Sequence, residues 1–259
     1  MTLRNFARLA IAGSAFAFLA SSALADGIGA SLLTQQHPFY IELANAMKSE
    51  ATAKNVKLEV AIANQDLNMQ LADVEDFIVK GVDVTSYIGT DNYAGGVKAG
   101  ELMAKVLGDK GEVAIIDYPT VQSVVNRIDG FKKAIGEHKD IKIVAQQTGI
   151  TRAEALAAAQ NMLQANPDID GIFGFGDDAA LAAAVAVKSA GLEKQVKVIG
   201  FDGMEEARHA VDTNPVMVGV IQQFPDKMGK QAVDTAVDVI AGKTVPTEQP
   251  IEPGVYVRT

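Results

Sequence analysis

The sequence contains no cysteine, no tryptophan and only three histidines among its 259 residues. Without cysteine the protein has no disulfide, no thiolate nucleophile and no cysteine-ligated metal site, so its fold depends on the apolar core. The patterns H-E-x-x-H, G-x-S-x-G and G-x-x-x-x-G-K-[ST] are also absent, which removes common signatures of zinc proteases, serine hydrolases and P-loop proteins. We therefore expect a protein that is not an enzyme, with no catalytic residue, no metal and no cofactor.

Positive charge is also scarce. The chain has 23 basic and 32 acidic residues, a net charge of −9, and its lysines and arginines are scattered singly. A nucleic acid or an anionic membrane would require a basic stripe, and no apolar run after the N-terminal segment approaches the length of a membrane span. We expect a mature protein that is not membrane-embedded, binds no nucleic acid and is a monomer.

The N-terminal segment 1–25 has the layout of a cleavable secretory signal. Arg4 and Arg8 precede an almost unbroken apolar run at 10–20, and Ala23-Leu24-Ala25 forms an A-x-A signature before Asp26. The run is too short to span a bilayer, and a buried helix would show polar positions at helical spacing. We expect the mature chain to begin near Asp26 and to work in the periplasm.

From residue 28 onward, short apolar runs alternate with longer amphipathic segments, which is the pattern of a parallel sheet covered by helices. The expected strands are 28–33, 56–62, 82–88, 112–116, 141–147, 171–175, 196–200 and 216–221. The expected helices are 39–54, 67–79, 94–107, 121–135, 151–165, 178–190, 204–211 and 225–241, followed by an extended end at 243–259. Because the alternation restarts after an expected turn or crossover at 89–92, we expect an α/β fold of two doubly wound lobes.

Polar and aromatic side chains gather at the C-terminal ends of the expected strands, where open α/β sheets present ligand sites. These segments are His37–Tyr40, Thr90–Asn92, Tyr118, Asp177–Asp178, Phe201–Gly203 and Gln222–Phe224. Carboxylates and amides that converge beside aromatic rings match the hydroxyls and C–H surfaces of a sugar.

Each of these residues also has a simpler interpretation. Asp178 suits the N-cap of its helix, and Asp202 suits the cap of the helix expected from Met204. Phe39 and Tyr40 are equally consistent with core positions. The recurrence of such residues at successive strand ends is what favours a binding site.

These segments, in this order after a signal, resemble the ribose-binding-protein family of periplasmic solute receptors that serve ABC transporters. The resemblance covers nearly all of the mature chain and rests on His37–Tyr40, Ile88–Asn92, Arg127 with Gly130-Phe131, Gly200–Gly203 and Gln223–Asp226. It implies two Rossmann-like lobes that close on a sugar about hinge crossings near 90–91, 223–224 and 252–253. The implied N-terminal lobe is 26–90 plus 224–252, and the implied C-terminal lobe is 91–223 plus 253–259.

Matching positions in this family imply roles for individual residues. Phe39 and Tyr40 would form the aromatic wall of the N-terminal lobe, and Arg127 would bind ring or hydroxyl oxygens from the C-terminal lobe. Asp202 matches the carboxylate of the family, and Gln223 matches its hinge glutamine. Together with the strand-end residues above, the candidate ligand-binding set is His37, Phe39, Tyr40, Asn92, Tyr118, Arg127, Asp177, Phe201, Asp202 and Gln223.

The sequence also departs from the family at the expected site. His37 stands where an amide is usual, Asp177 where asparagine is common, and Ile150 where an opposing aromatic ring is often found. These differences argue against an unaltered ribose pocket. Two carboxylates facing one arginine also disfavour an acidic ligand, because excess buried negative charge is costly. We therefore expect a neutral sugar or a polyol.

One stretch of the family pattern is absent. Family members continue from a segment like 81–84 through a helix and another strand, whereas Val84 here is followed directly by Thr85-Ser86-Tyr87. The missing stretch is roughly one strand–helix–strand unit of about thirty residues, and it normally carries an aspartate that binds the sugar. Either 82–88 fuses two strands into one, or the N-terminal lobe is poorly formed.

The sequence thus predicts a periplasmic receptor that captures a sugar and delivers it to the permease of an ABC transporter. Two alternatives stay open: a degenerate receptor with impaired ligand capture, and a sensory receptor for a chemoreceptor or sensor kinase. An exported α/β hydrolase is disfavoured because no nucleophile–base pair is evident.

Overall fold

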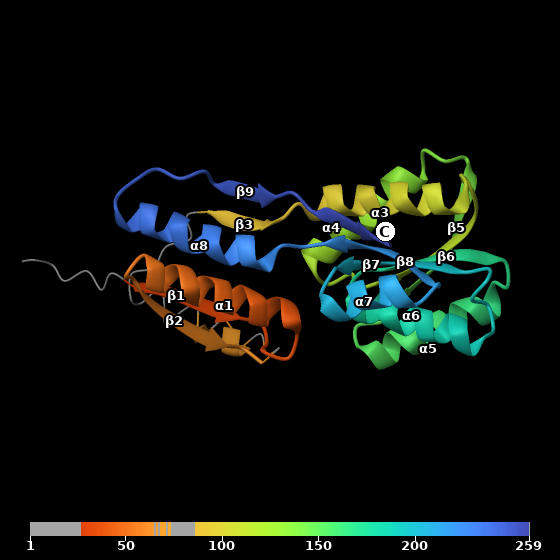
Figure 1. Ribbon diagram of the computed structural model, residues 1–259, viewed down its shortest axis with the longest axis horizontal. Helices are drawn as coiled ribbons and strands as arrows, with labels where there is room; N and C mark the ends of the chain where they lie inside the picture. Colours follow the sequence, from red (N-terminus) through yellow and green to blue (C-terminus); the bar gives the residue numbers. More distant parts are fainter. Residues whose placement is uncertain (1–26, 65, 67, 71, 74–85, 259) are drawn as a thin grey trace, which may run out of the picture.

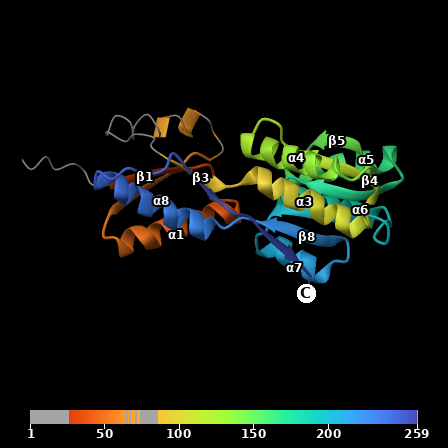
Figure 2. The ribbon, with the colours of Figure 1, turned by 90° about the horizontal axis from the view of Figure 1, so that it is seen from above.

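The computed structural model describes residues 27–64, 66, 68–70, 72–73 and 86–258, which form two lobes joined side by side (Figure 1). A view turned by 90° shows the same separation (Figure 2). The expected signal at 1–25, much of the expected helix at 67–79 and the start of the expected strand at 82–88 lie outside the described residues. Among the described residues, no helix has both the length and the apolar character to cross a bilayer.

The C-terminal lobe is built on a six-stranded sheet in the order β10-β8-β7-β6-β4-β5. Its parallel strands are β4 (Lys110–Asp117), β5 (Asp140–Thr148), β6 (Ile169–Gly174), β7 (Lys197–Asp202) and β8 (Met217–Gln222). β10 (Gly254–Val257) pairs with β8 in the antiparallel direction and forms one edge. The helices of this lobe are α3 (Asn92–Leu107), α4 (Gln122–Ile135), α5 (Arg152–Ala165), α6 (Asp177–Ser189) and α7 (Glu205–Thr213).

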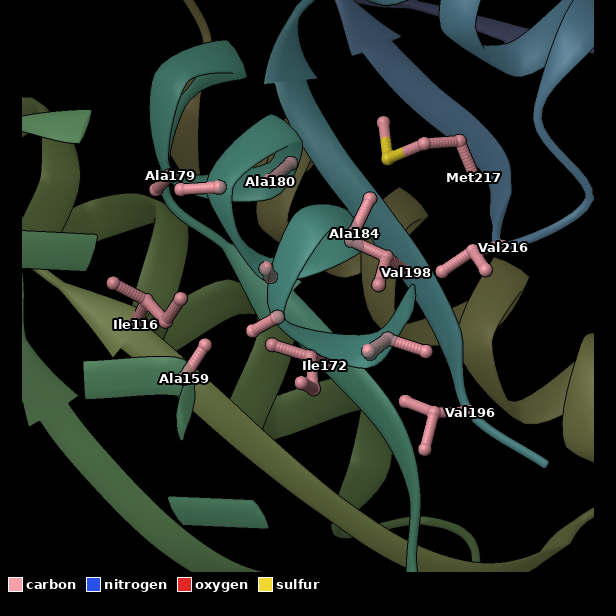
Figure 3. Close-up of a cluster of buried hydrophobic side chains, with 14 of the residues drawn as sticks. Ile116, Ala159, Ile172, Ala179, Ala180, Ala184, Val196, Val198, Val216 and Met217 are labelled. Atoms are coloured by element: carbon pink, nitrogen blue, oxygen red, sulfur yellow. The ribbon is translucent and has the colours of Figure 1, made fainter. Parts of the chain in front are cut away.

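Alternation along the strands gives this sheet a separate apolar core on each face. Val113 and Ile115 of β4 pack with α3 and α4, whereas Ala114 and Ile116 pack with α5, α6 and α7. Successive strand residues point to opposite faces, so a strand buried on both sides is apolar throughout. Figure 3 shows strand side chains such as Ile172 beside the alanines of α6.

The N-terminal lobe has a divided sheet. β1 (Gly27–Leu32) pairs in parallel with β2 (Lys57–Ile62), and β3 (Tyr87–Thr90) pairs in parallel with β9 (Glu248–Ile251). Within the described part of the chain these two pairs are separate two-stranded sheets. α1 (Pro38–Ala53) and α8 (Pro225–Ile240) pack on each other in this lobe (Figure 1).

Some local expectations are refined and one is wrong. The connection expected at 89–92 narrows to Asp91, since β3 runs through Thr90 and α3 begins at Asn92, with Asp91 capping that helix through a hydrogen bond from the Ala94 N–H. The expected extended end of the chain contains the strands β9 and β10. Asp178 does not cap α6: the N-cap is Gly176, and the Asp178 carboxylate instead accepts hydrogen bonds from Arg152.

The two lobes differ sharply in how much apolar surface they bury. The described core cluster of the N-terminal lobe has Ala30, Met47, Ala51 and Val233 as its buried members, and no residue of β2 is buried. In the C-terminal lobe, nearly every residue of β6 and β7 is buried. Apolar burial drives folding, so the C-terminal lobe has the larger share of the stability.

We expect this difference to appear in amide hydrogen exchange. Backbone amides in β4, β6 and β7 should exchange at least about a hundredfold more slowly than those in β1 and β2, because strands with few buried contacts open locally at low cost. Mass spectrometry of peptic fragments from the full chain measures both sets under one condition. Equal protection of β1 and β6 would contradict the expectation.

Candidate ligand-binding site

A close crossing of α3 and α4 places Arg127 beside the first residue of α3. A Cβ on Gly96 would lie 2.0 Å from the Arg127 carbonyl oxygen, and a Cβ on Gly130 would lie 2.2 Å from the Tyr93 carbonyl oxygen. Any larger side chain at either glycine would force the helices apart. This crossing brings the Arg127 side chain to Asn92, which the turn at Asp91 presents at the start of α3.

The Arg127 side chain is buried and held by several groups. Its Nε donates a hydrogen bond to Asn92 Oδ1 at 2.8 Å, and its Nη1 donates to the Phe175 carbonyl oxygen at 2.8 Å and to Asp202 Oδ1 at 3.0 Å. The guanidinium carbon lies 3.9 Å from the centre of the Phe201 ring, a cation–π contact. No residue in the described part of the chain accepts from Nη2, which leaves these N–H groups available.

Asp202 ends β7 in an unusual backbone conformation. Its φ is 97°, in a region that residues other than glycine seldom adopt, and the following Gly203 has a φ of 73°. The Asp177 carboxylate holds this turn, because it accepts hydrogen bonds from the Gly203 N–H at 3.2 Å and the Met204 N–H at 2.8 Å. Asp202 does not cap the following helix, whose N-cap is Met204. Asp177 therefore fixes the direction in which Asp202 points.

The two carboxyl groups also influence each other electrostatically. Burial raises the pKa of Asp177 well above the usual range of an aspartate, and the negative charge of Asp202 raises it further. The N–H groups of Met204 and Gly203 and the charge of Arg127 oppose this rise in part. The site thus holds an Asp177 of raised pKa beside an Asp202 that is paired with Arg127.

Residues of the N-terminal lobe approach Asp202 from the other side. His37 is the N-cap of α1, where its Nδ1 accepts a hydrogen bond from the Phe39 N–H at 3.2 Å. Its Nε2 lies 3.9 Å from Asp202 Oδ2. Tyr40 packs edge-on against Phe39, and its pKa is raised by burial and then by the charge of Asp202. Both lobes therefore present side chains to one carboxylate.

A closed ring of hydrogen bonds links Asp202 to the chain segments between the lobes. Thr90 Oγ1 donates to Gln223 Oε1 at 2.7 Å, and Gln223 Nε2 donates to Asp202 Oδ1 at 2.6 Å. Arg127 bridges Asp202 to Asn92, whose Nδ2 donates to the Thr90 carbonyl oxygen at 2.9 Å. The members of this Thr90–Asp202 ring are all buried, from Thr90 at 3% exposed to Gln223 at 8%.

The remaining candidates are placed around this ring. Tyr118 packs edge-on against Phe175 with ring centres 5.9 Å apart, so it lies beside the carbonyl that binds Arg127. Phe201 is fully buried, and the guanidinium of Arg127 stacks on the face of its ring. Ile150 is half-exposed at the start of α5.

Sequence reasoning missed part of the network. The Thr90 hydroxyl and the Phe175 carbonyl oxygen both belong to it, although neither was a candidate. Thr90 lies in a segment that the sequence singled out, but a threonine at a strand end gives no signal of its own. A backbone carbonyl cannot be identified as a partner from residue type at all.

Replacing Asp177 with asparagine tests whether the pKa of this carboxyl group is raised in the folded protein. Because the pKa of Asp177 is raised in the folded protein, the folded state binds more protons than the unfolded state, and this group lowers stability as pH rises. In Asp177→Asn this group no longer ionises, so its contribution to the loss of stability at higher pH disappears. The free energy of unfolding of the variant, relative to the parent, should therefore increase as pH rises from about 4 to about 8.

Urea unfolding across this pH range measures the difference. Asp129→Asn, at an exposed position on α4, controls for removing one negative charge from the same lobe. A difference between Asp177→Asn and the parent that stays constant with pH would contradict the described environment.

The sequence of this chain matches a known protein family. Residues 83–244 match the family described as periplasmic binding protein domain. The ribose import binding protein of Escherichia coli (strain K12) is 28% identical over 291 aligned positions, which cover 97% of this chain and 98% of the relative. The D-allose-binding periplasmic protein of the same organism is 34% identical over 181 positions, covering 68% of this chain and 58% of the relative.

The alignment with the ribose relative is longer than this chain, so the relative carries residues that have no counterpart here. The predicted shortening of the chain is therefore confirmed.

A solved structure extends the likeness to three dimensions. The periplasmic solute binding protein of an ABC transporter from Actinobacillus succinogenes 130z, with bound D-allose, superposes with a TM-score of 0.83 at 28% identity. The superposition covers 88% of this chain and 96% of the other. The predicted two-lobed α/β fold is confirmed. Taken together, the match over most of the sequence and the shared architecture show that the chain belongs to the periplasmic binding protein family.

Proposed function

We propose that this protein captures a neutral sugar or polyol between its lobes in the periplasm and delivers it to the permease of an ABC transporter. The observation that carries the proposal is the convergence of both lobes on Asp202: His37 approaches it from one lobe, and Arg127 binds it within the other. The names of the relatives, which import ribose or bind D-allose, supply the class of ligand and the transport role.

The proposed lobes are 26–90 plus 224–252 and 91–223 plus 253–259, preceded by a signal at 1–25 that directs export. Three connections between the lobes support these boundaries. They lie at Asp91 between β3 and α3, at Gln223-Phe224 between β8 and α8, and at Glu252-Pro253 between β9 and β10. Rotation at such short connections changes the gap between lobes while leaving each lobe intact.

The charges of the proposed site suit an uncharged ligand. Arg127 and Asp202 neutralise each other, and burial raises the pKa of Asp177, so the site disfavours further negative charge. A charged ligand would be buried without a counter-charge, which is costly. The free N–H groups of Arg127 donate hydrogen bonds, Asp202 Oδ2 accepts them, and the Tyr40 hydroxyl does both, which matches the hydroxyls of a sugar.

Binding proceeds without a chemical step in this proposal. A ligand that touches both lobes does so fully only when they are closed, so it binds the closed form more tightly and shifts the population toward it. The closed form is what a permease would recognise. A sensory receptor would use the same capture step, and it differs only in the partner that reads the closed form.

A degenerate receptor is the second candidate, and the shortening of the chain relative to the ribose relative favours it. Among the described residues, the apolar core of the N-terminal lobe is also the smaller of the two. This candidate predicts weak or absent capture by a C-terminal lobe that is itself well folded.

A panel of D-ribose, D-allose, other pentoses and hexoses, and myo-inositol tests capture directly. We expect at least one of these to raise the melting temperature of the mature protein by about 6 °C at a concentration near 100 times its Kd. The same ligand should compact the protein in solution scattering. If no member of the panel does either, transport binding is wrong and the degenerate receptor is favoured.

Substitutions at the salt bridge test the proposed site. Asp202→Ala leaves the buried Arg127 without its partner, and Arg127→Ala removes the guanidinium that both donates to the ligand and orients Asp202. Each should weaken binding of the sugar identified in the panel by about 100-fold, since buried hydrogen bonds to charged groups are worth up to about 3 kcal/mol.

Calorimetry gives the affinities. Arg152→Ala is the matched control, because Arg152 pairs with Asp178 and Glu206 on the same lobe but is largely exposed. Unchanged affinity in both Asp202→Ala and Arg127→Ala would refute the assignment of the site.

A further inference from the structure

We infer that Thr90 is a positioning residue, which couples the hinge to the ligand-facing carboxylate through the Thr90–Asp202 ring. The inference rests on the proposed function, because it concerns how closure and capture communicate. Thr90 ends β3 at one connection between the lobes, and Gln223 follows β8 at another. The hydrogen bond from Thr90 Oγ1 to Gln223 Oε1 therefore joins two connections that are far apart in sequence.

The Gln223 amide lies between the Thr90 hydroxyl and the Asp202 carboxylate. The carboxylate only accepts hydrogen bonds, so it requires the Gln223 NH2 group to face it. Gln223 Oε1 then faces Thr90, whose hydroxyl donates to it. The Thr90 hydroxyl thus satisfies the buried amide oxygen and holds the side chain that donates to Asp202.

The other side of the ring fixes the same segment a second time. Asn92 accepts from Arg127 through Oδ1 and donates to the Thr90 carbonyl oxygen through Nδ2. The side chain of Thr90 is thereby tied to Asp202 through Gln223, and its backbone carbonyl is tied to Asp202 through Asn92 and Arg127. Rotation between Thr90 and Asn92 changes both ties together, so a hinge movement alters the support of the carboxylate.

The hydrogen bonds of the ring are buried, so the loss of one of them is costly. Thr90 is 3% exposed and Asp202 is 8% exposed, so water cannot readily replace a lost partner. Besides Gln223, the Thr90 hydroxyl has the Met228 sulfur at 3.9 Å, which is a weak acceptor. Removal of the hydroxyl consequently leaves Gln223 Oε1 without its buried donor.

The test compares Thr90→Val, which keeps the shape and removes the hydroxyl, with Thr90→Ser, which keeps the hydroxyl. We expect Thr90→Val to weaken binding of the panel sugar about tenfold and Thr90→Ser to stay within about twofold of the parent. A loss in Thr90→Ser as large as that in Thr90→Val would overturn the inference, because the methyl group and not the hydroxyl would then be responsible.

A double-mutant cycle with Gln223→Met separates the bond from general destabilisation. If the Thr90–Gln223 bond carries the effect, the double variant should bind no more weakly than Gln223→Met alone. Independent, additive losses would overturn the inference. If Thr90→Val folds poorly, Thr90→Ala, which also lacks the hydroxyl, takes its place in the same cycle with Gln223→Met.

A measurement without any sugar distinguishes failure of this inference from failure of the proposed function. The chain has no cysteine, so Ser49→Cys on α1 and Ser189→Cys on α6 can carry spin labels at two chosen, exposed sites. Thr90→Val should broaden the distribution of distances between the labels, and Thr90→Ser should not. If no panel sugar binds the parent, the proposed function fails while this distribution still decides the inference, and identical distributions overturn it.

Discussion

The salt bridge between Arg127 and Asp202 is the interaction on which the site depends. Neither charge is stable alone in a buried position, so each requires the other and the neutral groups around them. Asn92 and the Phe175 carbonyl oxygen complete the shell of Arg127, and Gln223 completes that of Asp202. The outcome is a carboxylate of fixed direction whose second oxygen faces the other lobe. This arrangement prepares hydrogen-bonding groups before any ligand arrives, which lowers the cost of capture.

The local backbone explains how a short sequence segment produces that direction. Asp202 is the last residue of β7, so it lies at the carboxyl end of the parallel strands. The positive φ angles of Asp202 and Gly203 then turn the chain sharply. Such a conformation costs free energy in a residue with a Cβ and persists when its surroundings hold it. Asp177 does so by accepting two backbone N–H groups of the turn, at the expense of placing a second carboxyl near the first. Burial and the charge of Asp202 accordingly raise the pKa of Asp177.

Sequence patterns predicted the strand-end clustering because period and position determine where strands deliver side chains. They were less informative wherever the outcome depended on tertiary partners. Asp178 has a suitable capping side chain, yet Arg152 binds it and Gly176 takes the cap position. The sequence indicated a turn or crossover at 89–92, but not where the strand before it ends: pairing of β3 with β9 keeps the chain extended through Thr90. That pairing partner lies near the other end of the chain, where no local pattern reveals it.

The division of the N-terminal sheet does not by itself remove that lobe's share of the site. His37 and Tyr40 belong to the first turn of α1, and α1 is held by α8. A Cβ on Gly229 of α8 would lie 2.7 Å from the Leu43 carbonyl oxygen, so the two helices are in close contact.

Ion pairs between Lys54 and Asp234 and between Lys230 and Glu50 reinforce this packing along the surface of the helices. α8 begins at Pro225, two residues after Gln223, and the Gln223 side chain donates a hydrogen bond to Asp202 of the C-terminal lobe. The N-terminal side of the site is thus supported through α8 by the better packed lobe. A shortened sheet weakens the outer part of the N-terminal lobe first, and the groups that face Asp202 last.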